Sequence, residues 1–182
     1  MLYVLLIAVA VLVLDQVSKL LVVYLMQEGE IISIIPDFFR LTSERNDGAA
    51  WSANIPYWLL IVITVVALGF FIYLAKKIKF KTEKWYGFSL GFLFGGAIGN
   101  FIDRLFYPNH EVVDFLSFIL YYPAKVNGGL VFSQYYFPVF NIADSFLVIG
   151  VIMFIIYLFF IEPASRKKAA KEKENESGAK NE

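Results

Sequence analysis

The run LYVLLIAVAVLVLDQVSKLLVVYLM, residues 2–26, carries only two charged side chains, Asp15 and Lys19. A helix needs about 20 predominantly apolar residues to cross the hydrocarbon core of a bilayer. Three further runs of similar length are also poor in charge, and they lie at about 57–75, 86–106 and 138–161. The sequence therefore predicts an all-α membrane protein with four transmembrane helices.

The composition of the whole chain agrees with this prediction. Of its 182 residues, 59% are apolar or aromatic and 18% are charged, and the mean hydropathy is +0.64. A soluble domain is about 45–50% apolar, and a soluble core of this size cannot bury four such segments. The net charge is zero, so no overall positive field attracts nucleic acid, and we expect no nucleic-acid partner.

Several kinds of catalytic site are disfavoured by what the sequence lacks. The chain has no cysteine, which excludes a disulfide scaffold, a cysteine nucleophile and a cysteine-ligated metal. The only histidine is His110, and neither H-E-x-x-H nor G-x-S-x-G occurs, so a zinc protease and a Ser–His hydrolase are disfavoured. No P-loop or dinucleotide-binding glycine motif is present. We interpret His110 as a solvated loop residue.

The basic residues predict the orientation of the chain in the membrane. Eleven of them lie in the linker 76–84 and in the tail after residue 161, whereas three lie in the other two connections. Because basic residues accumulate on the cytoplasmic side, both termini are expected in the cytoplasm of a multi-pass plasma membrane protein. The segments 27–56 and 107–137 then face outward.

The outward segments have the composition of short strands and turns. Residues 31–42 are rich in β-branched and aromatic types, and residues 121–137 predict an aromatic hairpin with its turn at 127–129. We therefore expect a small extracytoplasmic β-rich subdomain within a single four-span domain of residues 1–163. The tail 164–182 is charged, without apolar periodicity, and is expected to be disordered.

Polar side chains inside the expected spans suggest specific packing. Asp15 and Lys19 are spaced i, i+4 and can form an ion pair on one helix face, which is a structural role. In the third span a glycine recurs at every fourth position, which allows another helix to approach closely. The members of this glycine stripe are Gly87, Gly91, Gly95 and Gly99.

Two carboxylates have no basic partner nearby in the sequence. Asp114 follows the third span, and Asp144 lies near the outer end of the fourth. Two carboxyl groups in a low-dielectric site cannot both ionise easily, which suits general acid–base hydrolysis of an amide. The same acids, with Asp15 and Lys19, also suit an ion-coupled transporter or channel. A structural adaptor without activity is a further alternative.

Five runs of the sequence, in order, resemble the motifs of the lipoprotein signal peptidase (signal peptidase II) family. Together they extend over nearly the whole chain apart from the tail. They are Asp15 to Lys19, Arg45 to Trp51, Gly99 to Arg104, Val112 to Phe115, and Phe140 to Asp144.

The resemblance implies a bacterial intramembrane aspartic endopeptidase that uses no metal or organic cofactor. Its substrates would be lipid-modified prolipoproteins, cut just before a diacylglyceryl-modified cysteine, and its other contacts would be membrane lipids. Motif position implies that the catalytic residues are Asp114 and Asp144. It implies substrate-binding roles for Asn46, Gly48, Asn100, Arg104 and Asn141. It implies structural polar roles for Asp15, Lys19 and Asp103.

The chain departs from the family pattern in two places. The family usually has glycine two residues before the Val-Val-Asp run, where this chain has His110 followed by Glu111. The connection 116–139 between the two aspartate motifs is long and aromatic, which leaves substrate selectivity open. We expect the protein to function as a monomer.

Overall fold

The fold combines a group of long helices with one antiparallel sheet. The computed structural model describes residues 2–48, 55–76, 84–126, 129–165 and 167. Of the expected tail 164–182, residues 164, 165 and 167 are described, and they are helical, in contrast to the expected disorder. The rest of the tail, residues 49–54 and the expected turn residues 127–128 lie outside the described residues. In chain order the elements are α1 (Leu2–Leu25), β1 (Ile31–Ile35), β2 (Phe39–Asn46), α2 (Tyr57–Lys76), α3 (Lys84–Phe106), the short 3-10 turn η2 (Pro108–His110), β3 (Val112–Val126), β4 (Gly129–Tyr136), α4 (Ile142–Ile156) and its π-helical continuation η3 (Tyr157–Ile161).

Three of the described helices are long and apolar enough to cross a membrane. They are α1, α2 and the continuous helix Ile142–Ser165 that contains α4. The helix α3 is of similar length, but its glycines and polar residues make it less apolar. The protein is therefore a multi-pass membrane protein by the length and composition of its helices.

The fourth helix begins later than the apolar run predicts. Expected from residue 138, it starts at Ile142, because Phe140 is held extended by backbone hydrogen bonds with Leu116 of 2.8 and 3.1 Å. Asn141 then caps the helix with its side chain, which accepts from the backbone N–H of Asp144. Extended backbone with an asparagine at the cap position is a favourable start for a helix.

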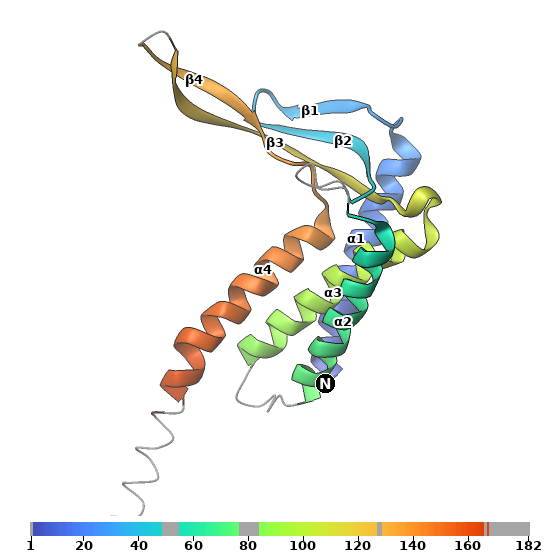
Figure 1. Cartoon of the computed structure of the whole chain (residues 1–182), viewed down its shortest axis with the longest axis vertical. Coiled ribbons are helices and arrows are strands. Elements are labelled where there is room, and N and C mark those ends of the chain that lie inside the picture. The colour runs from blue at the N-terminus through green and yellow to red at the C-terminus, as the bar shows by residue number, and fades with distance from the viewer. Residues whose placement is uncertain (1, 49–54, 77–83, 127–128, 166, 168–182) are drawn as a thin grey trace, which may run out of the picture.

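The four strands form one sheet in the order β1-β2-β3-β4, with every neighbouring pair antiparallel. The strands expected within 31–42 are confirmed, and the expected hairpin is longer than predicted because β3 already starts at Val112. Figure 1 shows the sheet lying across the end of the helix group where α1 ends and α4 begins. A helical membrane group with an antiparallel sheet describes the fold better than the expected all-α class.

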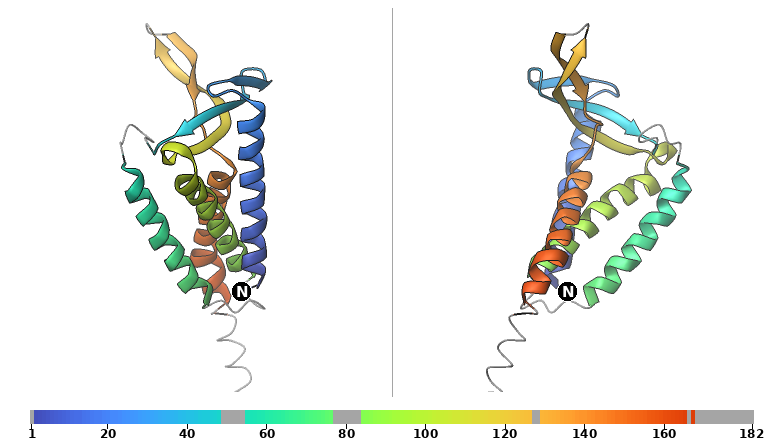
Figure 2. Two further views of the ribbon diagram at one scale, coloured as in Figure 1. Left: turned by 90° about the vertical axis from the view of Figure 1, so that its right-hand side faces the viewer. Right: turned by 60° about the vertical axis from the view of Figure 1, so that its left-hand side comes forward.

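The helix group is centred on α3, which contacts the other three long helices, whereas α2 buries none of its residues. The two views of Figure 2 show α2 standing apart from the other helices toward the sheet. The glycine stripe of α3 faces α1: a Cβ added at Gly95 would lie 2.6 Å from Cβ of Val11. The predicted close approach of a helix is thereby confirmed.

Candidate active site

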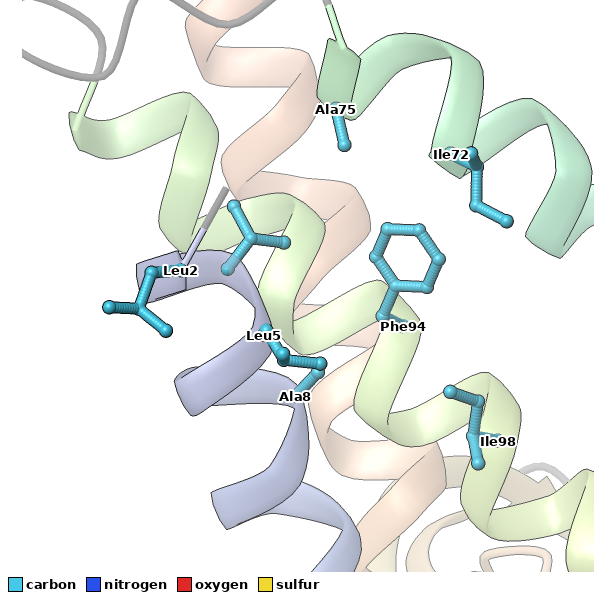
Figure 3. Close-up of a pocket in the computed structure, with 8 residues that line it drawn as sticks. Leu2, Leu5, Ala8, Ile72, Ala75, Phe94 and Ile98 are labelled. Carbon is cyan, nitrogen blue, oxygen red and sulfur yellow. The ribbon is translucent and has the colours of Figure 1, made fainter.

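The polar site lies under the sheet and away from an open cavity between α1, α2 and α3. That cavity, of about 460 Å³, is lined by apolar side chains of α1, α2 and α3. Figure 3 shows Leu2, Ala75 and Phe94 around it. Leu2 is the first residue of α1, Ala75 lies in the last turn of α2, and Phe94 lies midway along α3. The described side chains that line the cavity are all apolar, whereas buried polar side chains gather where β3 meets α3 and α4.

Asp114 lies at the start of β3 and is only 2% exposed. Its Oδ2 accepts a hydrogen bond of 2.8 Å from Nδ2 of Asn46, and its Oδ1 accepts one of 2.7 Å from Nδ2 of Asn141. Burial raises the pKa of the Asp114 carboxyl to about 7, and the nearby charge of Asp144 acts in the same direction. Near neutral pH this carboxyl therefore exists in both protonation states.

Asp144 occupies the first turn of α4, where the helix dipole favours a negative charge. Its Oδ2 accepts from the backbone N–H of Asn141 at 3.2 Å, which completes a reciprocal capping box. Its Oδ1 accepts from Nδ2 of Asn100 at 2.7 Å. Both carboxylate oxygens of Asp144 therefore accept a hydrogen bond.

Two asparagines connect the carboxylates through an unbroken set of hydrogen bonds. Nδ2 of Asn141 donates to Oδ1 of Asp114 and, at 3.0 Å, to Oδ1 of Asn100. Nδ2 of Asn100 in turn donates to Asp144. Asn141 is fully buried and Asn100 is 8% exposed, so these contacts are largely shielded from water. The two aspartates therefore belong to one site, although they come from a strand and a helix.

A buried cluster of charges lies directly beside this site. Lys19 forms ion pairs of 2.8 Å with both Asp15 and Asp103, and its third contact is Oδ1 of Asn100 at 2.9 Å. Lysine, aspartates and amide are all nearly inaccessible to solvent. The ion pair of Asp15 with Lys19 that the spacing predicts is confirmed, and Asp103 joins it from α3.

The charge cluster also holds α4 in place. Oδ1 of Asp15 accepts a 2.8 Å hydrogen bond from the backbone N–H of Ala143, in the first turn of α4. The Asp15 side chain also packs directly against α3. A Cβ added at Gly99 of α3 would lie 2.5 Å from Oδ2 of Asp15, so the glycine is what leaves room for this side chain. The cluster thereby ties three helices together at the level of the aspartates.

The remaining predicted substrate contacts lie around the same site. Oδ1 of Asn46 accepts from the backbone N–H of Gly48 at 2.8 Å, which fixes the side chain that reaches Asp114. Gly48 adopts a φ of +97°, a conformation that favours glycine. Arg104 donates to the backbone oxygen of Asn100 at 3.3 Å, and its buried Nε has no hydrogen-bond partner among the described residues.

Two residues near the site differ from the expectation. His110 is not a solvated loop residue: its ring stacks on Tyr57 with 4.0 Å between centroids, and its Nδ1 lies 2.8 Å from the backbone oxygen of Arg104. These contacts hold it at a φ of +62°, where glycine is the usual residue. Gln16 was not singled out, yet its Nε2 donates to Asp103 at 2.9 Å and to the backbone oxygen of Gly99 at 3.2 Å. Its position in the sequence between Asp15 and Lys19 is the feature that could have indicated its part in this polar cluster.

The chemistry open to this arrangement is acid–base chemistry by two carboxyl groups. Among the described residues, no group of three or more histidine, aspartate or glutamate side chains is arranged to hold a metal ion.

Comparison with known proteins identifies the family. Residues 7–160 match the family model described as signal peptidase (SPase) II. The lipoprotein signal peptidase of Listeria monocytogenes serotype 4a (strain HCC23) is 43% identical over 158 residues, covering 86% of this chain and 93% of that protein. The lipoprotein signal peptidase of Geobacillus kaustophilus (strain HTA426) is 43% identical over 155 residues, covering 85% and 91% respectively.

Solved structures agree with the sequence comparisons. A bacterial membrane enzyme determined by the in meso method at 2.3 Å resolution has a TM-score of 0.70 and 37% identity, covering 90% of both chains. A second such enzyme, at 1.9 Å resolution, has a TM-score of 0.70 and 38% identity, covering 86% of this chain and 92% of its own. This chain therefore belongs to the signal peptidase II family of membrane peptidases.

Proposed function

We propose that this signal peptidase II cuts the signal peptides of lipid-modified prolipoproteins with Asp114 and Asp144 as its two catalytic groups. The scissile bond would lie just before the diacylglyceryl-modified cysteine. The observation that carries the proposal is the hydrogen-bonded connection of the two carboxylates through Asn141 and Asn100. The ion-coupled transporter is not favoured, because the family consists of peptidases.

The surroundings of the two carboxyl groups suggest different protonation states. Asp144 lies at a helix N-terminus and accepts two N–H hydrogen bonds, one from the Asn100 side chain and one from the backbone of Asn141. Asp114 is almost fully buried, and burial raises its pKa to about 7. In the resting enzyme we therefore assign the negative charge to Asp144 and the proton to Asp114.

Lys19 supports this assignment by orienting the Asn100 amide. The ammonium group has only donors, so the atom of Asn100 that faces it at 2.9 Å must be the oxygen. The amide nitrogen then faces Asp144, where it donates to the carboxylate. Lys19 reaches Asp144 through Asn100 and does not contact it directly, so its role is to position the site.

The reaction follows from the two protonation states. Asp144 removes a proton from a water molecule, whose oxygen attacks the carbonyl carbon of the scissile peptide bond. Asp114 gives its proton to the carbonyl oxygen, which yields a neutral tetrahedral diol. Proton transfer from Asp144 to the peptide nitrogen then allows the C–N bond to break. Asp114 recovers its proton as the carbonyl reforms, and both carboxyl groups return to their initial states.

Substrate binding is assigned to the polar groups beside the aspartates. Nε of Arg104 has no partner in the part of the chain that the structure describes, and the guanidinium group can donate to a carbonyl or to a polar lipid group. Asn46 and Gly48 form the turn that delivers an amide to Asp114. We further assign substrate contacts to Asn100 and Asn141, and structural roles to Asp15 and Asp103.

The proposed topology places this site where substrate and water meet. Four spans, with α3 as the third, put both termini in the cytoplasm and the sheet on the outer face. A substrate with an acyl chain cannot leave the bilayer cheaply, because each buried CH₂ is worth about 0.8 kcal/mol. The aspartates at the sheet end of the helices can therefore meet the lipidated segment at the membrane edge. We propose that a monomer suffices.

The proposal is tested with purified protein in lipid nanodiscs and a synthetic prolipoprotein peptide that carries the diacylglyceryl group. The expected product, detected by mass spectrometry, begins at the modified cysteine. A matched peptide without the lipid should be cut far more slowly. If the lipidated peptide stays intact while vesicles reconstituted with the protein conduct protons, the peptidase proposal is wrong and the transporter hypothesis replaces it.

A further inference from the structure

The strands β3 and β4 continue beyond the rest of the sheet as a two-stranded hairpin arm. The strand β2 pairs with β3 only as far as Phe118, whereas β3 and β4 pair from Ile119 with Tyr136 to Val126 with Gly129. We call residues 119–126 and 129–136 the hairpin arm. In Figure 1 the arm reaches out past the side of the molecule on which α4 lies.

The arm exposes apolar side chains on both of its faces. Phe132 is 72% exposed, and the adjacent Val131, whose side chain points to the opposite face, is 42% exposed. No acidic residue occurs from 115 to 143, and the arm has a single basic residue, Lys125. The other large exposed apolar residues of the arm are Leu120, Tyr121, Tyr122, Leu130, Tyr135 and Tyr136. Contiguous exposed apolar surface of this kind marks a site of contact with a membrane or with another protein.

The arm is continuous with the surface that faces lipid. Only residues 137–141 separate β4 from α4, where the outward-facing Val148 is 59% exposed, and in its continuation η3 Phe159 is 70% exposed. The arm therefore starts where a membrane helix leaves the hydrocarbon. Four of its exposed side chains are tyrosines, which are typical of the membrane–water interface because one end is apolar and the other polar.

The backbone of the arm limits how deep it can lie. In the described part of the chain, β4 is an edge strand, and β3 has no second strand partner beyond Phe118. An unpaired strand edge costs several kcal/mol per polar group in hydrocarbon, where water is absent. In the headgroup layer water can satisfy these groups, while apolar side chains still contact lipid.

We propose that the hairpin arm is immersed in the headgroup layer of the outer leaflet, where it anchors the sheet above the aspartates. The base of the arm transmits this attachment to the sheet: Arg40 of β2 donates to Ser117 at 3.0 Å and lies over the ring of Tyr136 at 5.0 Å. The inference rests on the topology proposed above and adds a lipid-binding surface to the peptidase.

Spin labels test the immersion directly, because the chain has no cysteine and each introduced cysteine is unique. Phe132→Cys and Val131→Cys place nitroxides on opposite faces of the arm. Phe159→Cys on the exposed face of η3 and Glu28→Cys in the exposed connection after α1 provide the lipid and water references. The proteins are reconstituted in phosphatidylcholine–phosphatidylglycerol vesicles, and collisions with oxygen and with a water-soluble nickel complex are compared by electron paramagnetic resonance.

Immersion predicts that labels at 131 and 132 both collide with oxygen more than with nickel, at a ratio several-fold above that of position 28. A ratio equal to that of position 28 at either site would overturn the proposal. Spectral broadening that disappears on dilution with unlabelled protein would assign the surface to a second copy and would also overturn it. Depth is read without measuring cleavage, so a failure here leaves the peptidase assignment intact.

Discussion

Asn141 is the residue on which the geometry of the site depends most. Its side chain donates to Asp114 and accepts from the backbone N–H of Asp144, and its own backbone N–H donates back to Asp144. One side chain therefore sets the start of α4 and the placement of both carboxyl groups. Its use as a helix cap explains why an asparagine, with both a donor and an acceptor, is suited to this position.

The protonation of Asp114 makes a prediction about pH. Its carboxyl must be protonated to act as an acid, and its pKa is raised to about 7 by burial and by the charge of Asp144. As the pH rises through this value the proton is lost, so kcat/KM should fall about tenfold for each further pH unit. Steady-state cleavage of the lipidated peptide between pH 6 and 9 measures this, and a constant kcat/KM over that range would contradict the assignment.

Removing the ammonium group of Lys19 should destabilise the protein. Lys19→Met leaves Asp15 and Asp103 buried without their cation, and breaking a buried ion pair in this way costs about 3–5 kcal/mol. Thermal unfolding in detergent measures the loss. The matched variant Lys167→Met removes an exposed ammonium group and should unfold like the wild type. Equal unfolding of the two variants would show that the cluster contributes no stability.

Local spacing predicted part of this site, and packing between helices decided the rest. The pair of Asp15 with Lys19 follows from i, i+4 geometry on one helix. Asp103 and Asn100 also contact Lys19, because α3 turns the face that carries them toward α1. The residue spacing within α1 does not reveal which face of α3 this is. His110 was misread for the same reason, because the ring of Tyr57 that covers it belongs to another element.

The glycines of α3 set the distances between helices. A methyl group at Gly95 would lie 2.6 Å from Cβ of Val11 and 2.7 Å from the backbone oxygen of Ala8. Gly95→Ala should therefore destabilise the protein by about 1–3 kcal/mol through overpacking. Thermal unfolding in detergent measures the change.

Gly69 in α2 provides the control for this substitution. Among the described residues, no atom of another element lies within 4 Å of a Cβ added there, so Gly69→Ala should be neutral or stabilise by up to about 1 kcal/mol through helix propensity. Destabilisation of equal size in the Gly69 and Gly95 variants would mean that close helix approach is not the reason for the glycine at 95.

Helices were easier to predict from the sequence than strands. Long apolar runs mark α1 and α2 almost to the residue, because a span must be apolar throughout. The apolar residues 138–140 resemble the fourth span in composition, yet Phe140 pairs with Leu116 as extended chain. The long β3 was also underestimated, since an apolar run after a span does not reveal whether a partner strand is present.

At the scale of the whole molecule, the long apolar helices are suited to lie in the membrane, and the sheet is proposed to lie at its outer surface. The proposed topology places β1 to β4 outside and both termini inside the cell. Glu28→Cys should therefore react with a membrane-impermeant maleimide on intact cells, whereas Lys167→Cys should react only after permeabilisation. Labelling of Lys167→Cys in intact cells would contradict the proposed orientation.

The central claim is that Asp114 and Asp144 together hydrolyse the peptide bond. The direct measurement is cleavage of the lipidated peptide in nanodiscs by Asp114→Asn and Asp144→Asn, with Asp37→Asn as control. Asp37 is exposed, and its φ of +56° is one that asparagine tolerates. Both site variants should remain folded and yield no detectable product, while the control cuts at the wild-type rate. Wild-type cleavage by either site variant would contradict the account.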